Sequence, residues 1–127
     1  LSNHLLDTPW PKVEKGTQAL GVLLSGKGLL PEDLFRLLLD RTAAPDEVLP
    51  DTGVGLEMER MLSPVFISSP DYGTRSSTVI LLDREGRVTF IEKSFRNGFG
   101  ESSTVEHLFA LEPDPRKHVV DRSCEAG

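Results

Sequence analysis

Hydrophobic residues in the first part of the chain recur at the spacing of an α-helix. One stripe of this kind follows residues 8–25 and consists of Val13, Thr17, Leu20 and Leu24. This spacing predicts a helix with one apolar face. Gly16 and Gly21 each weaken an isolated helix by about 1 kcal/mol relative to alanine, so the segment is predicted to pack closely against a neighbour.

A second helix is predicted to begin at Pro31, because proline suits a first helical turn and two acidic residues follow it at the positive end of the helix dipole. Apolar side chains surround most of this helix: Leu34, Phe35, Leu37, Leu38 and Leu39. A helix of this kind needs cover on more than one side. Proline, glycine and aspartate then predict a loop over residues 43–55, and residues 56–62 fit a short helix.

From residue 65 onward the apolar positions follow the period of β-strands. Strands are predicted over residues 65–68, 77–82, 87–93 and 104–111. Residues 83–86, with the sequence DREG, predict a tight hairpin in which the glycine supplies a positive φ. Residues 95–103 are predicted to form a loop, and residues 112–127, which include two prolines, a loose tail.

The strand over residues 77–82 is apolar at every position from Val79 to Leu82, which predicts a central strand that is buried on both faces. Helices followed by an antiparallel meander predict an α+β fold, with the helices on one face of the sheet. No predicted element remains to cover the second face. The sequence therefore predicts that residues 1–111 are one part of a larger folded unit.

Charge and composition exclude several classes of function. The 127 residues carry 14 Lys and Arg against 20 Asp and Glu, a net charge of −6, and no basic cluster that would bind nucleic acid. No apolar run is long enough for a membrane span. The single Cys124 excludes an internal disulfide framework. A soluble, cytoplasmic chain without a metal or cofactor of its own is the prediction.

Residues 70–78 are the richest in side chains that carry chemistry. Arg75 has two interpretations that the sequence leaves open. It can pair with Asp71 across a turn, in a surface ion pair worth about 0–1 kcal/mol. Alternatively, its guanidinium stands at the mouth of a site, where it anchors a carboxylate or orients a nucleophile. The three histidines of the chain lack the spacing of metal ligands.

Asn3 also has two interpretations. An asparagine so close to the first residue of the sequence is usually a local turn former. Its side-chain amide is also a suitable donor to an oxyanion, provided that another segment supplies a nucleophile. Because the chain offers no nucleophile in a recognisable motif, spacing alone favours the turn.

Two stretches of the chain resemble known motifs. Residues 1–12, LSNHLLDTPWPK, resemble the pattern Gly-Leu-Ser-Asn-x-x-Leu-x-Thr-Pro-Trp-x-Lys, and residues 72–83, YGTRSSTVILLD, form the second match together with residues 86–94, GRVTFIEKS. Both are typical of the Transport and Golgi organisation family, also called NRDE after an Asn-Arg-Asp-Glu motif. The resemblance covers residues 1–95.

This resemblance implies the fold of the N-terminal nucleophile (Ntn) hydrolases, an αββα sandwich of two sheets between helical layers. It further implies that this chain is the C-terminal half, because the family's Met-Cys start and its Asn-Arg-Asp-Glu motif are absent here. In related amide hydrolases an N-terminal cysteine attacks a carbonyl, its own α-amine acts as the base, and an asparagine amide helps to hold the oxyanion.

By the same resemblance, Asn3 corresponds to the oxyanion-hole asparagine and Arg75 to the active-site arginine near the nucleophile, with Asp71 and Tyr72 as substrate contacts. The missing N-terminal half is then the expected partner, and this chain alone is expected to be inactive. A second hypothesis is a non-catalytic protein that binds or transports haem or an acyl lipid, although the chain lacks the Cys-x-x-Cys-His motif of attached haem.

Overall fold

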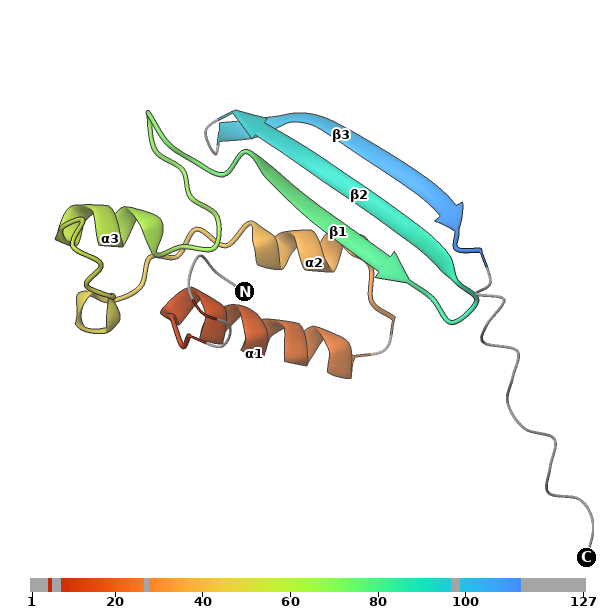
Figure 1. Ribbon diagram of the computed structural model, residues 1–127, viewed down its shortest axis with the longest axis horizontal. Helices are drawn as coiled ribbons and strands as arrows, with labels where there is room; N and C mark the ends of the chain where they lie inside the picture. The colour runs from red at the N-terminus through yellow and green to blue at the C-terminus, as the bar shows by residue number, and fades with distance from the viewer. Residues whose placement is uncertain (1–4, 6–7, 27, 97–98, 113–127) are drawn as a thin grey trace, which may run out of the picture.

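A computed structural model of the chain describes residues 5, 8–26, 28–96 and 99–112. Helices come first and an antiparallel sheet follows (Figure 1). The elements are α1 (Pro11–Ser25), α2 (Pro31–Leu38), the 3-10 helix η1 (Asp46–Val48), α3 (Leu56–Leu62), β1 (Ser76–Leu82), β2 (Arg87–Arg96) and β3 (Phe99–Ala110). The predicted α+β class, with helices before a meander, is therefore confirmed. Within the described ranges, no helix is long and apolar enough to cross a membrane.

Both long helices begin with a proline at their first position, as the sequence predicts for α2; the first helix, which the sequence predicts from residue 8, begins only at Pro11, after Trp10 as its N-cap. In α2 the Asp33 carboxylate accepts a hydrogen bond from the Leu30 backbone N–H at 3.2 Å and pairs with Arg36 at 2.9 Å. The carboxylate thereby accepts a hydrogen bond from a free N–H group at the helix start, and its negative charge interacts favourably with the positive end of the helix dipole. The α3 helix has the bounds that the sequence predicts, residues 56–62.

The sheet has the strand order β1-β2-β3, and both pairs are antiparallel. The predicted hairpin between β1 and β2 is confirmed: Gly86 has a φ of 80° and its N–H donates to the Asp83 carbonyl at 3.2 Å. The Asp83 carboxylate accepts the backbone N–H groups of Glu85 and Arg87 at 3.0 and 2.9 Å. These contacts, led by the Arg87 N–H, hold the pKa of Asp83 below its ordinary value.

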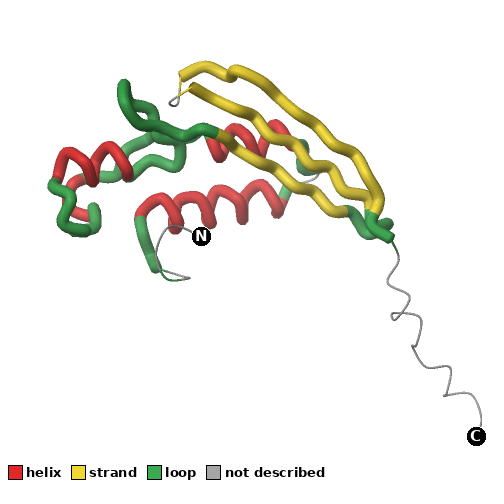
Figure 2. Tube along the Cα trace, turned by 45° about the horizontal axis from the view of Figure 1, so that its top comes forward, coloured by secondary structure: helices red, strands yellow, loops and turns green. Residues whose placement is uncertain are grey.

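One face of the sheet packs on α2, and α2 in turn packs on α1 (Figures 1 and 2). The fully buried side chains are Phe35 of α2 and Phe66, which precedes β1 and meets Phe95 of β2 edge to face at 4.9 Å. Lys93 of β2 lies over the Phe35 ring and pairs with Glu32 at 3.1 Å. The core of the described chain therefore lies between α2, the segment before β1, and the inner face of the sheet.

The opposite face of the sheet is largely exposed, and its half nearest the β1–β2 hairpin is mostly apolar. Side chains alternate along a strand, and the register places Leu82, Val88 and Phe109 in one row, of which Val88 is buried. Large exposed fractions mark this face: Ile80 61%, Leu82 60%, Phe109 50% and Val105 47%. The sequence prediction that β1 is central and buried on both faces is wrong for the described chain, because β1 is an edge strand with one covered face.

Two further predictions need correction. Residues 65–68 form no strand of the sheet; a single bridge joins Ser68 to Gly73, because Phe66 turns into the core and its N–H donates to the Asp40 carbonyl at 2.8 Å. Residues 95–103 are not a loop throughout. β2 continues to Arg96 and β3 begins at Phe99, with register shifts that accommodate the glycine-rich sequence.

Candidate functional site

The segment before β1, which carries the predicted site residues, is a hydrogen-bonded turn. The Ser69 N–H and hydroxyl both donate to the Tyr72 carbonyl, at 2.9 and 2.6 Å, and the Tyr72 N–H donates back to the hydroxyl oxygen. Ile67 and Thr74 are joined by two further bonds, at 2.9 and 3.0 Å. The Arg75 carbonyl then accepts the Phe95 N–H at 2.8 Å. The backbone that carries Arg75 is therefore fixed from both sides.

The Arg75 side chain is exposed, and within the described residues it forms no ion pair with Asp71 or with any other carboxylate. Most other basic residues of the helices and the hairpin are paired, for example Arg60 with Asp46. The pKa of Asp46 is held low chiefly by its hydrogen bonds from Arg60. Of the two interpretations of Arg75, the structural turn pair is thus not formed.

The remaining predicted site residues do not lie together in one site. Tyr72 is 55% exposed and lines a groove on the helical side of the molecule, whereas Asp71 is exposed and does not line it. Asn3 lies outside the described residues, so its predicted role at an oxyanion stays a prediction. Tyr72 closes the turn that begins at Ser69, whereas Arg75 follows three residues later and does not line the groove, and the relation of either residue to Asn3 stays open.

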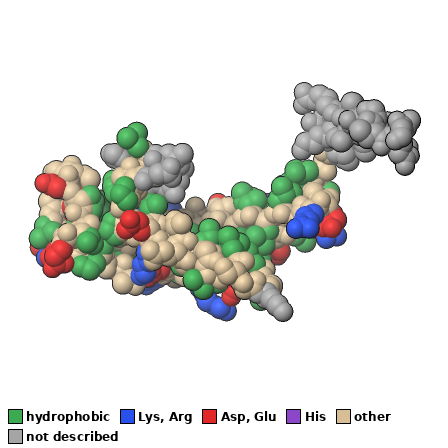
Figure 3. All heavy atoms as spheres, turned by 90° about the horizontal axis from the view of Figure 1, so that it is seen from below, with side chains coloured by type: hydrophobic (Ala, Val, Ile, Leu, Met, Phe, Trp, Pro, Cys, Tyr) green, Lys and Arg blue, Asp and Glu red, His purple; other side chains and the backbone are tan. Residues whose placement is uncertain are grey.

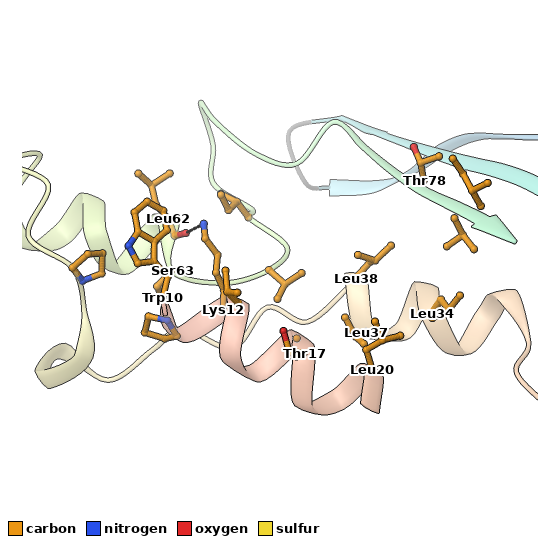
Figure 4. A pocket seen from close by; sticks show the side chains of 18 of the residues that line it. Trp10, Lys12, Thr17, Leu20, Leu34, Leu37, Leu38, Leu62, Ser63 and Thr78 are labelled. Atoms are coloured by element: carbon orange, nitrogen blue, oxygen red, sulfur yellow. Dashed lines mark hydrogen bonds between the residues drawn. The ribbon is translucent and has the colours of Figure 1, made fainter. Parts of the chain in front are cut away.

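The groove has a volume of about 910 Å³ and lies between α1, α2 and β1, with α3 at one end (Figure 4). Its lining is mostly aliphatic and includes Val13, Gly16, Leu20 and Leu24 of α1, Leu34, Leu37 and Leu38 of α2, and Thr78, Val79, Ile80 and Leu81 of β1. The stripe that the sequence predicts as the apolar face of the first helix therefore lines a hollow. It does not enter a packed core, since α1 contains no buried residue.

One end of the groove is polar, and the sequence analysis did not single it out. Lys12 Nζ donates to the Leu62 carbonyl at 2.9 Å and lies 5.7 Å from the centre of the Trp10 ring (Figure 4). Partial burial lowers the pKa of Lys12. Both residues belong to the Thr-Pro-Trp-x-Lys stretch of the first motif, which was the available signal. Tyr72 of the second motif lines the same groove.

The described residues contain no group of three or more His, Cys, Asp or Glu side chains that would hold a metal ion. His107 lies on the exposed face of the sheet, where its ring is 6.2 Å from that of its cross-strand partner Phe90. No histidine of the described chain lines the groove. The groove is therefore suited to apolar groups, with a hydrogen-bonding end near Lys12.

Comparison with known proteins connects these two motifs to one family. The family model described as Transport and Golgi organisation 2 matches residues 1–97. This chain belongs to that family. Its curated relatives include the Transport and Golgi organization protein 2 homolog of Bos taurus, which is 38% identical over an alignment of 121 residues that covers 88% of this chain. The human homolog is 41% identical over an alignment of 103 residues that covers 74% of this chain.

A third relative, the Transport and Golgi organization 2 homolog of Mus musculus, is 35% identical over 102 residues. The matched part covers 44% of the bovine protein and 37% of the human and mouse proteins. The chain thus spans less than half the length of these relatives. Most of the first motif, both strands of the β1–β2 hairpin and Arg75 all lie within the part that the Transport and Golgi organisation 2 model matches.

Proposed function

We propose that this chain is part of a longer Transport and Golgi organisation 2 protein that hydrolyses amide bonds by the Ntn mechanism. The observation that carries the proposal is the Arg75 guanidinium, which forms no ion pair with a carboxylate of the described residues and is held on a fixed backbone just before β1. A cation that the described chain leaves without a carboxylate is available to a substrate or to a nucleophile. The nucleophile itself comes from a part of the protein outside this chain.

The exposed face of the sheet supports the same proposal. Ile80, Leu82 and Phe109 form an apolar surface that a single layer of helices leaves uncovered. Contiguous exposed apolar surface on this scale marks a contact with further protein. In the αββα sandwich that we propose, a second sheet packs on this face, about 10 Å away.

The proposed reaction proceeds in two steps. The thiol of an N-terminal cysteine transfers its proton to its own α-amine, and the sulfur attacks the amide carbonyl carbon as the C=O π electrons move to oxygen. The side-chain amide of Asn3 donates to this oxyanion. Collapse of the intermediate expels the amine, which takes the proton, and water then hydrolyses the thioester. Arg75 orients the reacting groups by charge. The reaction requires neither metal nor cofactor, and we keep the cytoplasm as the proposed compartment.

A carrier of haem or of an acyl lipid is the second proposal, and the apolar groove is the observation that favours it. Because no histidine of the described residues lines the groove, an acyl chain fits it better than haem does. The open edge of β1 beside the groove, however, offers backbone donors and acceptors that an acyl chain leaves unsatisfied. Hydrolysis therefore remains the first proposal.

The experiment is to assay the full-length protein that contains this sequence against a panel of N-acyl amides. We expect turnover, and we expect Arg75→Ala to lower kcat by about 10²-fold or more. Arg84→Ala is the matched control, since Arg84 lies in the hairpin between β1 and β2 and is also exposed. Saturable binding of acyl ligands without turnover would replace the hydrolase by the carrier. Neither turnover nor binding would reject both.

A further inference from the structure

The open edge of β1 presents backbone groups in a regular row. In the β1–β2 pair, the Phe95 N–H donates to the Arg75 carbonyl and the Asp83 N–H donates to the Arg87 carbonyl. Hydrogen bonding alternates along an antiparallel strand, so the odd-numbered residues of β1 bond to β2. The N–H and C=O groups of Thr78 and Ile80 consequently point away from β2, toward the groove that both residues line.

The helix α1 is the second half of this feature. It packs on α2, which packs on β1, so α1 belongs to the same helical layer but lies farther from the sheet (Figures 1 and 2). Its apolar side chains are exposed accordingly, Leu24 at 62% and Leu20 at 38%. Figure 3 views the molecule from the α1 side and shows apolar side chains at the surface there. One helix of the layer thus has no sheet above it.

The two elements on either side of the groove are similar in length. The seven residues of β1 span about 23 Å, and the 15 residues of α1 span about 22 Å. A Cβ atom at Gly16, which lines the groove, would meet no described atom within 4 Å apart from its chain neighbours and the nearby backbone of its own helix. Although α1 packs on α2, Gly16 and Gly21 therefore lie against no close neighbour among the described residues.

We propose that a β-strand from another part of the same polypeptide adds to the open edge of β1 and packs its inner side chains on α1. Backbone bonds to Thr78 and Ile80 hold it, and apolar side chains at alternate positions fill the groove. The relatives indicate where this strand comes from, since the part matched by this chain is only 37–44% of their length and the rest can supply further strands. A second copy is disfavoured, because each copy carries a net charge of −6.

Proline at position 78 tests the backbone half of this proposal. Thr78→Pro removes an N–H that points to the open edge and leaves the bonds between β1 and β2 in place. Thr78→Val is the matched control, because both variants lose the hydroxyl that bonds Glu92 at 2.9 Å. In the full-length protein we expect proline to lower Tm by about 5 °C or more relative to valine. A difference of less than about 2 °C between the two variants overturns the proposal.

Gly16→Leu tests whether side chains of the added strand fill the groove. This test is independent of any damage that proline causes in β1. We expect Gly16→Leu to lower Tm in the full-length protein, where the added side chain meets the new strand. Gly21→Leu is the control, since Gly21 is exposed on the same helix and does not line the groove.

Equal Tm values in the full-length protein for Thr78→Pro and Thr78→Val, or for Gly16→Leu and Gly21→Leu, overturn the proposal, as does a dimer of the full-length protein that Thr78→Pro dissociates. Failure of only the full-length Thr78→Pro variant to fold, with Thr78→Val folding normally, supports it. These outcomes concern Tm and assembly, so they are independent of whether the protein hydrolyses amides.

Discussion

The helices α1 and α2 begin with similar sequences but differ in how much of their apolar surface is buried. Each starts with a proline and carries a leucine-rich face. In α2 that face includes Phe35, which is 0% exposed between the helix and the sheet, whereas α1 has no buried residue. Both helices therefore carry apolar side chains and pack on each other, but within the described chain only α2 also packs on the sheet and buries a side chain.

The difference teaches where the fold is incomplete. A helix gains most of its stability from packing its apolar face, so α1 alone lacks the contribution that α2 obtains from β1. The same side of the molecule contains the groove and the open edge of β1. An apolar helix face, a hollow and an unpaired strand edge at one place are together the signature of a missing strand.

The largest expected effect comes from truncating the buried side of α2. Phe35→Ala should lower the free energy of unfolding by about 3–4 kcal/mol, because it leaves a cavity between α2 and the sheet. Leu24→Ala, on the open face of α1, should cost less than about 0.5 kcal/mol in the 127-residue chain. Urea unfolding of both variants measures the contrast. Similar losses would show that the two helices are equally packed.

A smaller effect is expected at the contact between α2 and β2. Lys93 is only 14% exposed, lies 4.5 Å from the centre of the Phe35 ring and pairs with Glu32. Lys93→Ala should cost about 1–2 kcal/mol, since it removes both the stem and the charge. Lys93→Met keeps most of the stem and should retain about half of that stability. If added salt fails to narrow the difference between wild type and Lys93→Met, the charge contributes nothing.

The smallest effect concerns the junction of α1 with α2. Lys15 bonds the Asp40 carboxylate at 2.5 Å and, with help from Thr42, lowers the pKa of Asp40 to about 2. Because the folded pKa lies below the unfolded value of 3.8, this stabilisation is complete above about pH 4 and is lost as the pH falls through 2. Lys15 is half exposed, so solvent screening limits it to about 1 kcal/mol.

Asp40→Asn should therefore lower stability by about 1 kcal/mol at pH 7 and match the wild type near pH 2. Unfolding measured between pH 2 and pH 7 provides the test. An unchanged difference across that range would mean that the Asp40 charge has no part in holding α1 against α2.

Local chemistry explains which elements the sequence could predict. Proline at Pro31, the serine and proline after Leu62, and Gly86 in the hairpin act within a few residues, and the corresponding bounds are confirmed. The prediction of a strand over residues 65–68 is wrong because these apolar residues pack in the core and do not pair in the sheet. Phe66 is buried against Phe95 of β2, and the spacing of apolar residues within one segment cannot predict such a contact with a distant segment.

The edge position of β1 in the sheet and the ion pairing of Arg75 are set by contacts that the local sequence pattern does not contain. Four consecutive apolar residues correctly indicate that β1 has two apolar faces, but they do not say whether the cover lies in the same chain. The pairing of Arg75 with Asp71 was equally open, because it depends on how the turn at Ser69 orients the two side chains. The groove at Lys12 could not be predicted from the sequence, since its walls come from four separate elements that only the fold brings together.

Amide hydrogen exchange tests the central claim, that β1 receives another strand of the same protein. The account predicts that the Thr78 and Ile80 N–H groups exchange quickly in the 127-residue chain and at least about 10²-fold more slowly in the full-length protein. Val79, which already bonds to β2, serves as the internal reference. Equally fast exchange at Thr78 and Ile80 in both proteins, with Val79 protected in both, would contradict the account.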